Sequence, residues 1–283
     1  MIVFLYILAI VLAFMIGTVG FSFVNTVAYR FPRQKKILNE HFCCDFCETR
    51  IKAYEAIPVL SYLVLKGRCR YCGEPLSKRD FLNEIAGGVT GLIIFFRFGD
   101  VNDIASSFRL SSPIDIVVHF NVWKLFTLLI IFFFYCVLDL VILVDYDTME
   151  IPNRFVIVML FIAVASFFFL PGVSALSHLI GALCISVPMY LLTLVIPGAF
   201  GGGDIKLVAA IGLMLGWKLT IIGFLIGLLF GGIYGIWMLV SKKKEKKEHF
   251  PFGPFLCSGY MLAVICGMDI INAYLKMAVY IRG

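Results

Sequence analysis

Charged residues are scarce in this chain. They make up 15% of the 283 residues, whereas hydrophobic residues make up 61%, and the mean hydropathy is +0.98. This composition excludes a water-soluble globule, because a single core cannot bury so much apolar surface. The sequence also lacks an internal repeat, a dinucleotide-binding glycine fingerprint and any low-complexity tract beyond 242–247. It therefore predicts an all-α polytopic membrane protein.

Eight apolar stretches approach the ~20 residues that a helix needs to cross the hydrocarbon. The first is longer than the ~7 to 15 residues of a signal-peptide core and has no Ala-x-Ala site before the basic residues, so we expect it to be retained. The sixth is short for a full crossing. The predicted spans are 2–27, 81–98, 122–144, 154–171, 174–196, 205–217, 219–240 and 253–280.

The net charge of +6 is concentrated in two loops. Many Lys and Arg side chains lie between the first two spans, and five Lys residues lie within 242–247. The positive-inside rule places both loops in the cytoplasm, with both termini outside. The Lys cluster indicates topology and contact with lipid headgroups, so we expect membrane lipid as a partner and no nucleic acid.

The stretch 30–80 is the only one long and polar enough to fold outside the membrane. It contains the pairs Cys44-Asp-Phe-Cys47 and Cys69-Arg-Tyr-Cys72, with 21 residues between them. Four thiolates at this spacing suit a structural zinc, which a domain of about fifty residues needs because its apolar core is small. Two disulfides are the alternative, although the predicted cytosolic location is reducing. Cys43 and His41 are also possible ligands, but the regular spacing of the two Cys-x-x-Cys pairs favours neither of them.

Two aspartates stand where apolar stretches meet water. Asp145 opens the segment Asp-Tyr-Asp-Thr-Met-Glu-Ile-Pro-Asn at the end of the third span, and Asp204 lies in Gly-Gly-Gly-Asp-Ile-Lys before the sixth. The chain crosses the membrane twice between them, so both emerge on the cytoplasmic side. Ionisable groups at membrane depth cost at least ~2.5 kcal/mol, which makes a functional role the default. Two close carboxylates can share a proton, one activating water while the other protonates a carbonyl oxygen, as in an aspartic peptidase.

The residues around the two aspartates predict their local structure. Pro152 suits the first turn of the following helix, which places Asp145 on a short irregular turn. Gly201, Gly202 and Gly203 permit positive φ and leave room for an extended substrate backbone. Asp204 then lies at a helix N-terminus, which favours its ionised form.

Other interpretations of these acids stay open. Asp204 could only cap its helix, and Asp145 could only mark the membrane edge. Asp139, inside the third span, and Asp147, nearer to solvent, are the rival carboxylates.

Taken together, these motifs resemble those of the type IV prepilin peptidases along most of the chain. The chain departs from the family pattern at Cys43-Cys44-Asp, where Pro commonly follows the first ligand, and at Asp80-Phe81, where Tyr-Pro is usual. The matching segments are Gly20-Phe-Ser-Phe-Val-Asn25, Tyr29-Arg-Phe-Pro32, the two cysteine pairs, Ile57-Pro-Val-Leu-Ser-Tyr62, Leu82-Asn-Glu84, Asp145 with Ile151-Pro152-Asn153, Gly201-Gly-Gly-Asp204-Ile-Lys206 and Pro251-Phe-Gly-Pro-Phe-Leu256.

The resemblance implies a site and a fold. Asp145 and Asp204 correspond to the family's catalytic aspartates, although Tyr146-Asp147 is similar to the Tyr-Asp of presenilin-type enzymes and keeps Asp147 as an alternative. The resemblance also implies three domains: a first transmembrane helix at 1–29, a zinc domain with four cysteine ligands at 30–80 and a transmembrane peptidase domain at 81–283. The implied supporting residues are Gly201, Gly202, Gly203, Lys206, Asn25 and Glu84, of which Glu84 could instead be a helix-end charge and Asn25 an interhelical hydrogen-bonding group.

The resemblance further implies an activity in the bacterial inner membrane. Family members cut the basic leader of prepilins or pseudopilins after Gly on the cytoplasmic face, then methylate the new amino group with S-adenosylmethionine. The methyl-transfer activity attaches to residues 30–80 through the resemblance alone. Two other classes remain: a cation transporter whose two inward-facing acids bind an ion, and a non-enzymatic assembly factor of a secretion machine.

Overall fold

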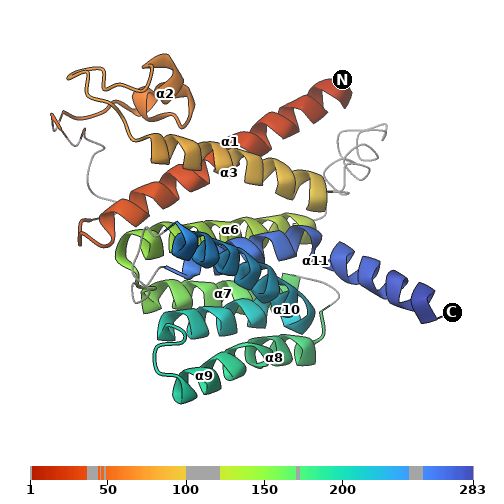
Figure 1. Ribbon diagram of the computed structural model, residues 1–283. Coiled ribbons are helices and arrows are strands. Elements are labelled where there is room, and N and C mark those ends of the chain that lie inside the picture. The colour runs from red at the N-terminus through yellow and green to blue at the C-terminus, as the bar shows by residue number, and fades with distance from the viewer. Residues whose placement is uncertain are drawn as a thin grey trace. The chain divides into compact units, whose positions relative to one another are not determined.

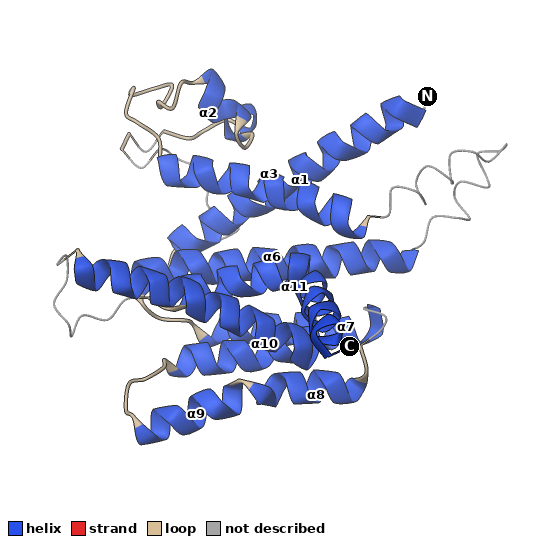
Figure 2. Cartoon of the chain, turned by 45° about the vertical axis from the view of Figure 1, so that its right-hand side comes forward, coloured by secondary structure: helices blue, strands red, loops and turns tan. Residues whose placement is uncertain are grey.

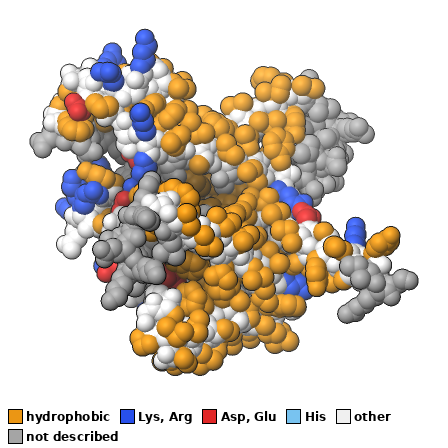
Figure 3. Space-filling view, in the orientation of Figure 1, with side chains coloured by type: hydrophobic (Ala, Val, Ile, Leu, Met, Phe, Trp, Pro, Cys, Tyr) orange, Lys and Arg blue, Asp and Glu red, His pale blue; other side chains and the backbone are white. Residues whose placement is uncertain are grey.

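The computed structural model describes residues 2–36, 44, 46–47, 49–99, 122–169, 173–241 and 251–282. The secondary structure of these residues is helical, with no strand among them (Figures 1 and 2). They fall into two compact units, Met1–Phe132 and Phe133–Gly283. Hydrophobic side chains cover much of the helical surface (Figure 3), as expected of helices that face lipid.

The first unit is built on a pair of long helices, α1 (Ile2–Arg30) and α3 (Lys78–Phe98). They approach closely because the residues at their crossing are small: a side chain on Gly17 would overlap the carbonyl group of Gly87. The polar segment between the helices contains the 3₁₀ turn η1 (Ala53–Ala56) and the short helix α2 (Leu60–Val64).

The second unit is a helical bundle centred on α10. It takes in most of α6 (Val122–Thr148), which begins before the unit boundary. Helix α10 packs against α7, α8 and α11. The remaining helices are α7 (Asn153–Phe169), α8 (Ala175–Cys184), α9 (Ser186–Val195), α10 (Gly202–Val240) and α11 (Gly253–Arg282).

Helix α10 consists of two helices that meet at Gly216. Gly216 has φ 74° and ψ 165°, a conformation that breaks the helix and that glycine tolerates because it lacks a Cβ. The two parts fold back on each other, since the ring of Phe200, just before the first part, lies 6.5 Å from that of Phe224 in the second. A straight helix would separate residues that far apart in sequence by about 36 Å. The predicted spans 205–217 and 219–240 are therefore distinct segments.

The protein is a multi-pass membrane protein. Six helical stretches among the described residues are long and apolar enough to cross a membrane. Helices α8 and α9 together make one of these stretches, and α7 is a shorter apolar helix. Because the span over α10 is divided at Gly216, the described helices agree roughly with the prediction of about eight crossings. The all-helical fold with a cysteine-rich segment between the first two spanning helices is confirmed.

A glycine contact in the second unit provides a test of this packing. A methyl group on Gly212 would overlap the carbonyl oxygen of Gly181, and backbone cannot move aside as a flexible side chain can. We expect Gly212→Ala to destabilise the protein by about 1–3 kcal/mol. The matched control is Gly232→Ala, because no atom lies within 4 Å of a Cβ at Gly232. Thermal unfolding in detergent measures both; equal melting temperatures would contradict the packing.

Candidate active site and metal centre

Asp145 lies in the last turn of α6, and its side chain is only 5% exposed. The expectation that it lies on an irregular turn is wrong. The helix continues to Thr148 and ends at Met149, which has φ 55° and still donates its N–H to the Asp145 carbonyl oxygen. The helix-breaking influence of Pro152 reaches only the residue before it, so the irregular segment begins after Asp145 rather than at it.

Asp204 lies in the first turn of α10, as the glycine-rich segment predicts. The backbone of Gly201 lies against its carboxylate: a Cβ on Gly201 would be 3.0 Å from Oδ2. No atom lies within 4 Å of a Cβ at Gly202, so the described residues leave open space at that position of the first turn.

Two contacts join the segment after Asp145 to the start of α10. Gly203 packs on Ile151, since a Cβ at Gly203 would lie 2.9 Å from the Ile151 Cβ. Lys206 Nζ donates a hydrogen bond to Asn153 Oδ1 over 3.1 Å. The two motifs, more than fifty residues apart, thus form one local structure.

The carboxylate of Asp145 is held from a third element. The backbone N–H of Gly253, the first residue of α11, donates to Asp145 Oδ2 over 3.0 Å. Asp145 and Asp204 are close enough for their charges to interact, and Cys257, fully buried one turn into α11, lies within electrostatic range of both. Sequence reasoning missed the contact of Gly253 with Asp145; the segment Pro251-Phe-Gly-Pro was noticed only as part of the resemblance.

The two rival acids differ in burial. Asp147 is exposed, whereas Asp139 is as buried as Asp145. Asp139 lies six residues before Asp145, away from the end of α6. Of the three acids in α6, Asp145 is the one that is both buried and in the last turn of the helix.

Asn25 and Glu84 lie in the first unit, in a hydrogen-bond network between α1 and α3. Asn25 accepts from Asn83 Nδ2 over 3.0 Å and donates to the Asp80 carbonyl oxygen over 3.2 Å. Glu84 accepts from Ser22 Oγ over 2.8 Å and from the Val59 N–H over 2.7 Å. These contacts give both residues a role in holding the first unit together.

The four predicted ligands Cys44, Cys47, Cys69 and Cys72 come together in the polar segment. Their sulfur atoms all lie within 4.8 Å of one another, and the four thiols are free. A cluster of this kind can hold a metal ion. The spare ligands Cys43 and His41, and the Lys cluster at 242–247, lie outside the described residues.

Local hydrogen bonds favour the thiolate form of two of these cysteines. Hydrogen bonds with Thr49 lower the pKa of the Cys47 thiol to about 6. Backbone N–H groups of Cys72 and Tyr71 lower the pKa of the Cys69 thiol. Metal ligation requires the thiolate, which these two cysteines favour. Cys72 differs: a backbone hydrogen bond with Glu74 lowers its pKa, but desolvation and the neighbouring cysteines outweigh it and raise the pKa of the Cys72 thiol to about 12.

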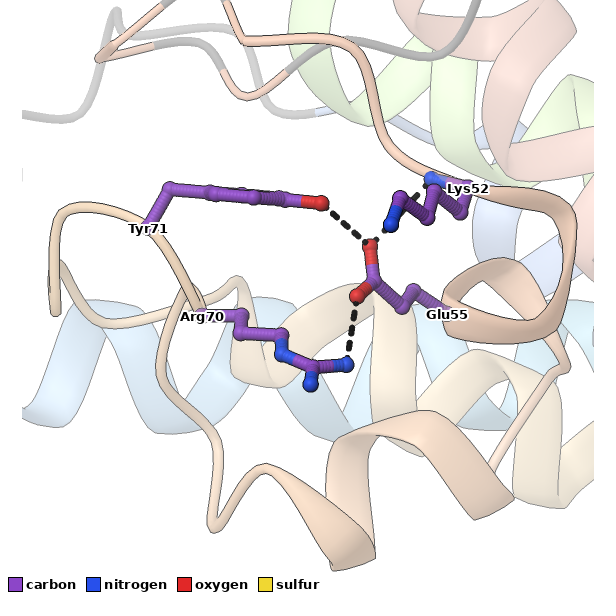
Figure 4. Close-up of polar contacts among 4 residues, drawn as sticks. All are labelled: Lys52, Glu55, Arg70 and Tyr71. Atoms are coloured by element: carbon purple, nitrogen blue, oxygen red, sulfur yellow. Dashed lines mark hydrogen bonds and ion pairs between the residues drawn. The ribbon is translucent and has the colours of Figure 1, made fainter.

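The buried carboxylate of Glu55 contacts the two residues inside the second cysteine pair (Figure 4). Glu55 accepts hydrogen bonds from Arg70 Nη1 over 2.8 Å, Tyr71 Oη over 3.1 Å and the Lys52 N–H over 3.2 Å. Desolvation alone would raise the pKa of Glu55, but these hydrogen bonds outweigh it and lower the pKa. Because Arg70 and Tyr71 stand between Cys69 and Cys72, Glu55 fixes the loop that carries both ligands.

The described residues thus define a helical membrane protein with a buried carboxylate, Asp145, and a half-buried one, Asp204, at the ends of helices α6 and α10. Residues 15–98 match the sequence profile of the bacterial peptidase A24 N-terminal domain, and residues 123–236 match that of the type IV leader peptidase family. The chain belongs to the type IV leader peptidase family, as the motifs of its sequence predict.

Relatives match over almost the whole chain. A Bacillus subtilis prepilin leader peptidase/N-methyltransferase is 31% identical, covering 94% of this chain and 97% of the relative. Proteins of the same name from Legionella pneumophila and Pseudomonas putida are 30% and 27% identical, covering 90% and 95% of this chain and 90% and 94% of their own lengths. No solved structure gives a significant match.

The contact between Gly253 and Asp145 leads to a prediction. A Cβ at Gly253 would lie 2.5 Å from Asp145 Oδ2, so Gly253→Ala must displace the carboxylate or the start of α11. We expect a loss of about 10²-fold in peptide cleavage, the size of effect that a displacement of about 1 Å produces. The Gly232→Ala variant is again the control and should keep its rate. A Gly253→Ala enzyme with unchanged kcat would show that this contact does not position Asp145.

Proposed function

We propose that the chain is an aspartic endopeptidase that removes the basic leader of type IV prepilins or pseudopilins after Gly, and then methylates the new N-terminus from S-adenosylmethionine. The observation that carries the proposal is the pairing of Asp145 and Asp204, brought from two distant motifs to adjoining helix ends in a chain of the leader peptidase family. The family membership and the names of the relatives support a peptidase over a transporter or an assembly factor.

In the proposed reaction the two carboxyl groups share one proton. The ionised carboxylate takes a proton from water, whose oxygen attacks the carbonyl carbon of Gly, while the protonated carboxyl group gives its proton to the oxygen of that carbonyl. The carboxyl group that received the water proton then passes it to the leaving nitrogen. Breakdown of the tetrahedral intermediate breaks the C–N bond and leaves the leader with a carboxylate and the pilin with a free amine. The Gly253 N–H holds one carboxylate in place, and Gly202 leaves room for the substrate backbone.

The arrangement of the site suits a substrate that lies partly in the membrane. Asp145 and Asp204 both lie within a turn of the end of an apolar helix, so an extended leader could reach them from water while the pilin helix stays in lipid. We assign the protein to the bacterial inner membrane with this site facing the cytoplasm, which agrees with the basic loop at 30–80. Gly203 and Lys206 support the site by joining the start of α10 to the segment after α6, and Gly201 lies against the Asp204 carboxylate.

We further propose that the four cysteines bind a structural zinc ion. A tetrahedral site with Zn–S bonds of about 2.3 Å has sulfur atoms about 3.8 Å apart. The Cys44 and Cys72 sulfur atoms are 3.8 Å apart, which fits this geometry. The ion would supply rigidity to a segment with little apolar core. Glu84 would hold that segment on α3 through the Val59 N–H, and Asn25 would join α1 to α3.

The order of the two activities gives an experiment that tests the proposal. Methylation needs the amine that cleavage creates, and the carboxylates have no part in attack on a sulfonium methyl group. Purified enzyme in detergent, given a prepilin with a Gly-Phe junction and labelled S-adenosylmethionine, should shorten and label the substrate. Asp204→Asn should do neither with full-length prepilin but should still label a precleaved pilin.

Two results would contradict the proposal in different ways. Cleavage without label would leave a peptidase without the methyltransferase. No cleavage of several prepilins, together with ion flux in liposomes that depends on Asp145 and Asp204, would favour the transporter.

A further inference from the structure

Helix α2 presents an apolar face that the described residues of the first unit leave exposed. Leu60, Leu63 and Val64 are 54%, 59% and 70% exposed, although they lie in a segment outside the membrane-spanning helices. Their spacing of three and four residues puts them on one face of the helix. We call these three residues the α2 patch. Large apolar side chains gathered on one exposed face mark a surface that contacts something other than water.

The opposite side of α2 is attached to the beginning of α3. The Tyr62 ring stacks on Phe81 with ring centroids 4.1 Å apart and an angle of 14° between the planes. The Val59 N–H, at the start of α2, donates to Glu84 Oε2 over 2.7 Å. Glu84 lies six residues into α3, which corresponds to about 9 Å along the helix axis. Helix α2 therefore lies beside the first two turns of α3 (Figure 1) and not beyond its end.

The backbone at the start of α2 is strained to keep this position. Val59 has φ 61°, which is rare for a β-branched residue because its side chain crowds the backbone. Strained conformations persist only where surrounding contacts enforce them. The bond to Glu84 is one such contact, so the placement of α2 is specified by the structure and is not an accident of a loose loop.

The position of α2 along the membrane-spanning helix α3 indicates the depth of α2 relative to the bilayer. Helix α3 is a membrane-spanning helix that begins at Lys78, and Leu82 in its second turn is 63% exposed. A helix beside these two turns lies at the boundary between headgroups and acyl chains. Exposed basic side chains flank it at Lys66, Arg68 and Lys78, where anionic headgroups would pair with them. Figure 3 shows Lys and Arg side chains beside hydrophobic ones at this end of the unit.

We propose that the α2 patch inserts into the phospholipid bilayer and holds the four-cysteine segment against the membrane surface. The occupant of the patch is lipid: acyl chains contact Leu60, Leu63 and Val64, and anionic headgroups contact the basic side chains around them. Interfacial helices of this kind bury an apolar face about 5–10 Å into the headgroup boundary. The proposal does not rest on the peptidase activity, because it follows from α3 spanning the membrane.

Fluorescence of a single tryptophan tests the proposal. Leu63→Trp is introduced into a chain in which Trp123, Trp217 and Trp237 are replaced by Phe, and the protein is placed in nanodiscs of phosphatidylcholine and phosphatidylglycerol. We expect blue-shifted emission that lipids brominated on the acyl chains quench strongly and aqueous acrylamide quenches weakly. Val64→Trp provides a second probe on the same face. The matched control is Phe46→Trp, at a residue that is 69% exposed in the first cysteine pair; its emission should be red-shifted and accessible to acrylamide.

Three outcomes would overturn the proposal. The first is water-like emission from both α2 probes without quenching by brominated lipid. The second is shielding of the probes only after a prepilin is added, which would assign the patch to the substrate. The third is equal lipid quenching of the α2 probes and the Phe46→Trp control, which would show general contact of the segment with lipid and no specific role for the patch.

Discussion

Asp145→Asn and Asp204→Asn should each lower the rate of leader cleavage by about 10²–10⁴-fold, the contribution typical of a general acid or base. An amide can neither take a proton from water nor give one to the carbonyl oxygen. The fold should survive, because an asparagine oxygen can still accept the Gly253 N–H that now bonds to Asp145. Single-turnover cleavage of a purified prepilin measures the loss, and thermal unfolding measures the fold.

Asp147→Asn is the matched control for these two variants. Asp147 is two residues from Asp145 but exposed, and we expect the substitution to change cleavage only mildly. An inactive Asp147→Asn enzyme beside an active Asp145→Asn enzyme would transfer the catalytic role to Asp147.

Loss of the metal should have the second large effect. Structural zinc sites of this kind contribute about 10–16 kcal/mol of binding free energy, and much of it is folding free energy of the segment that binds the ion. We expect wild type to carry one zinc ion per chain by mass-spectrometric metal analysis. Cys69→Ser should lose the ion and make the segment between α1 and α3 sensitive to protease, and it should impair methylation at least as much as cleavage.

Cys43→Ser should keep its zinc, because the regular spacing assigns the ligands to the two pairs. A wild-type protein without zinc, with Cys44, Cys47, Cys69 and Cys72 oxidised in native membranes, would contradict both the metal and the cytosolic location of the segment.

Much of the fold could be predicted because membrane helices depend on local properties. Length and hydropathy locate the spans, including the short stretch at 205–217 that joins the next helix at Gly216. The cysteine cluster could be predicted for a similar reason: the Cys-x-x-Cys spacing already brings each pair together. The position of Asp145 was mispredicted because the start of the irregular segment depends on Met149, whose positive φ is not apparent from its residue type.

The contacts that organise the site could not be predicted. Gly253 lies 108 residues from Asp145, and their hydrogen bond depends on how α6 and α11 pack. The hydrogen bonds that Glu55 accepts from Arg70 and Tyr71 likewise depend on how the polar segment folds. A sequence motif shows which residue types are present, but it does not show which backbone N–H groups their side chains will meet.

The central claim is that Asp145 and Asp204 act as one unit, and a comparison of single and double variants tests it most directly. Groups that work together in catalysis are not additive, so removing the second costs little once the first is gone. We predict that single-turnover cleavage by Asp145→Asn/Asp204→Asn is no slower than that of the slower single variant. Losses that multiply in the double variant would show that the two carboxylates act independently and would contradict the dyad.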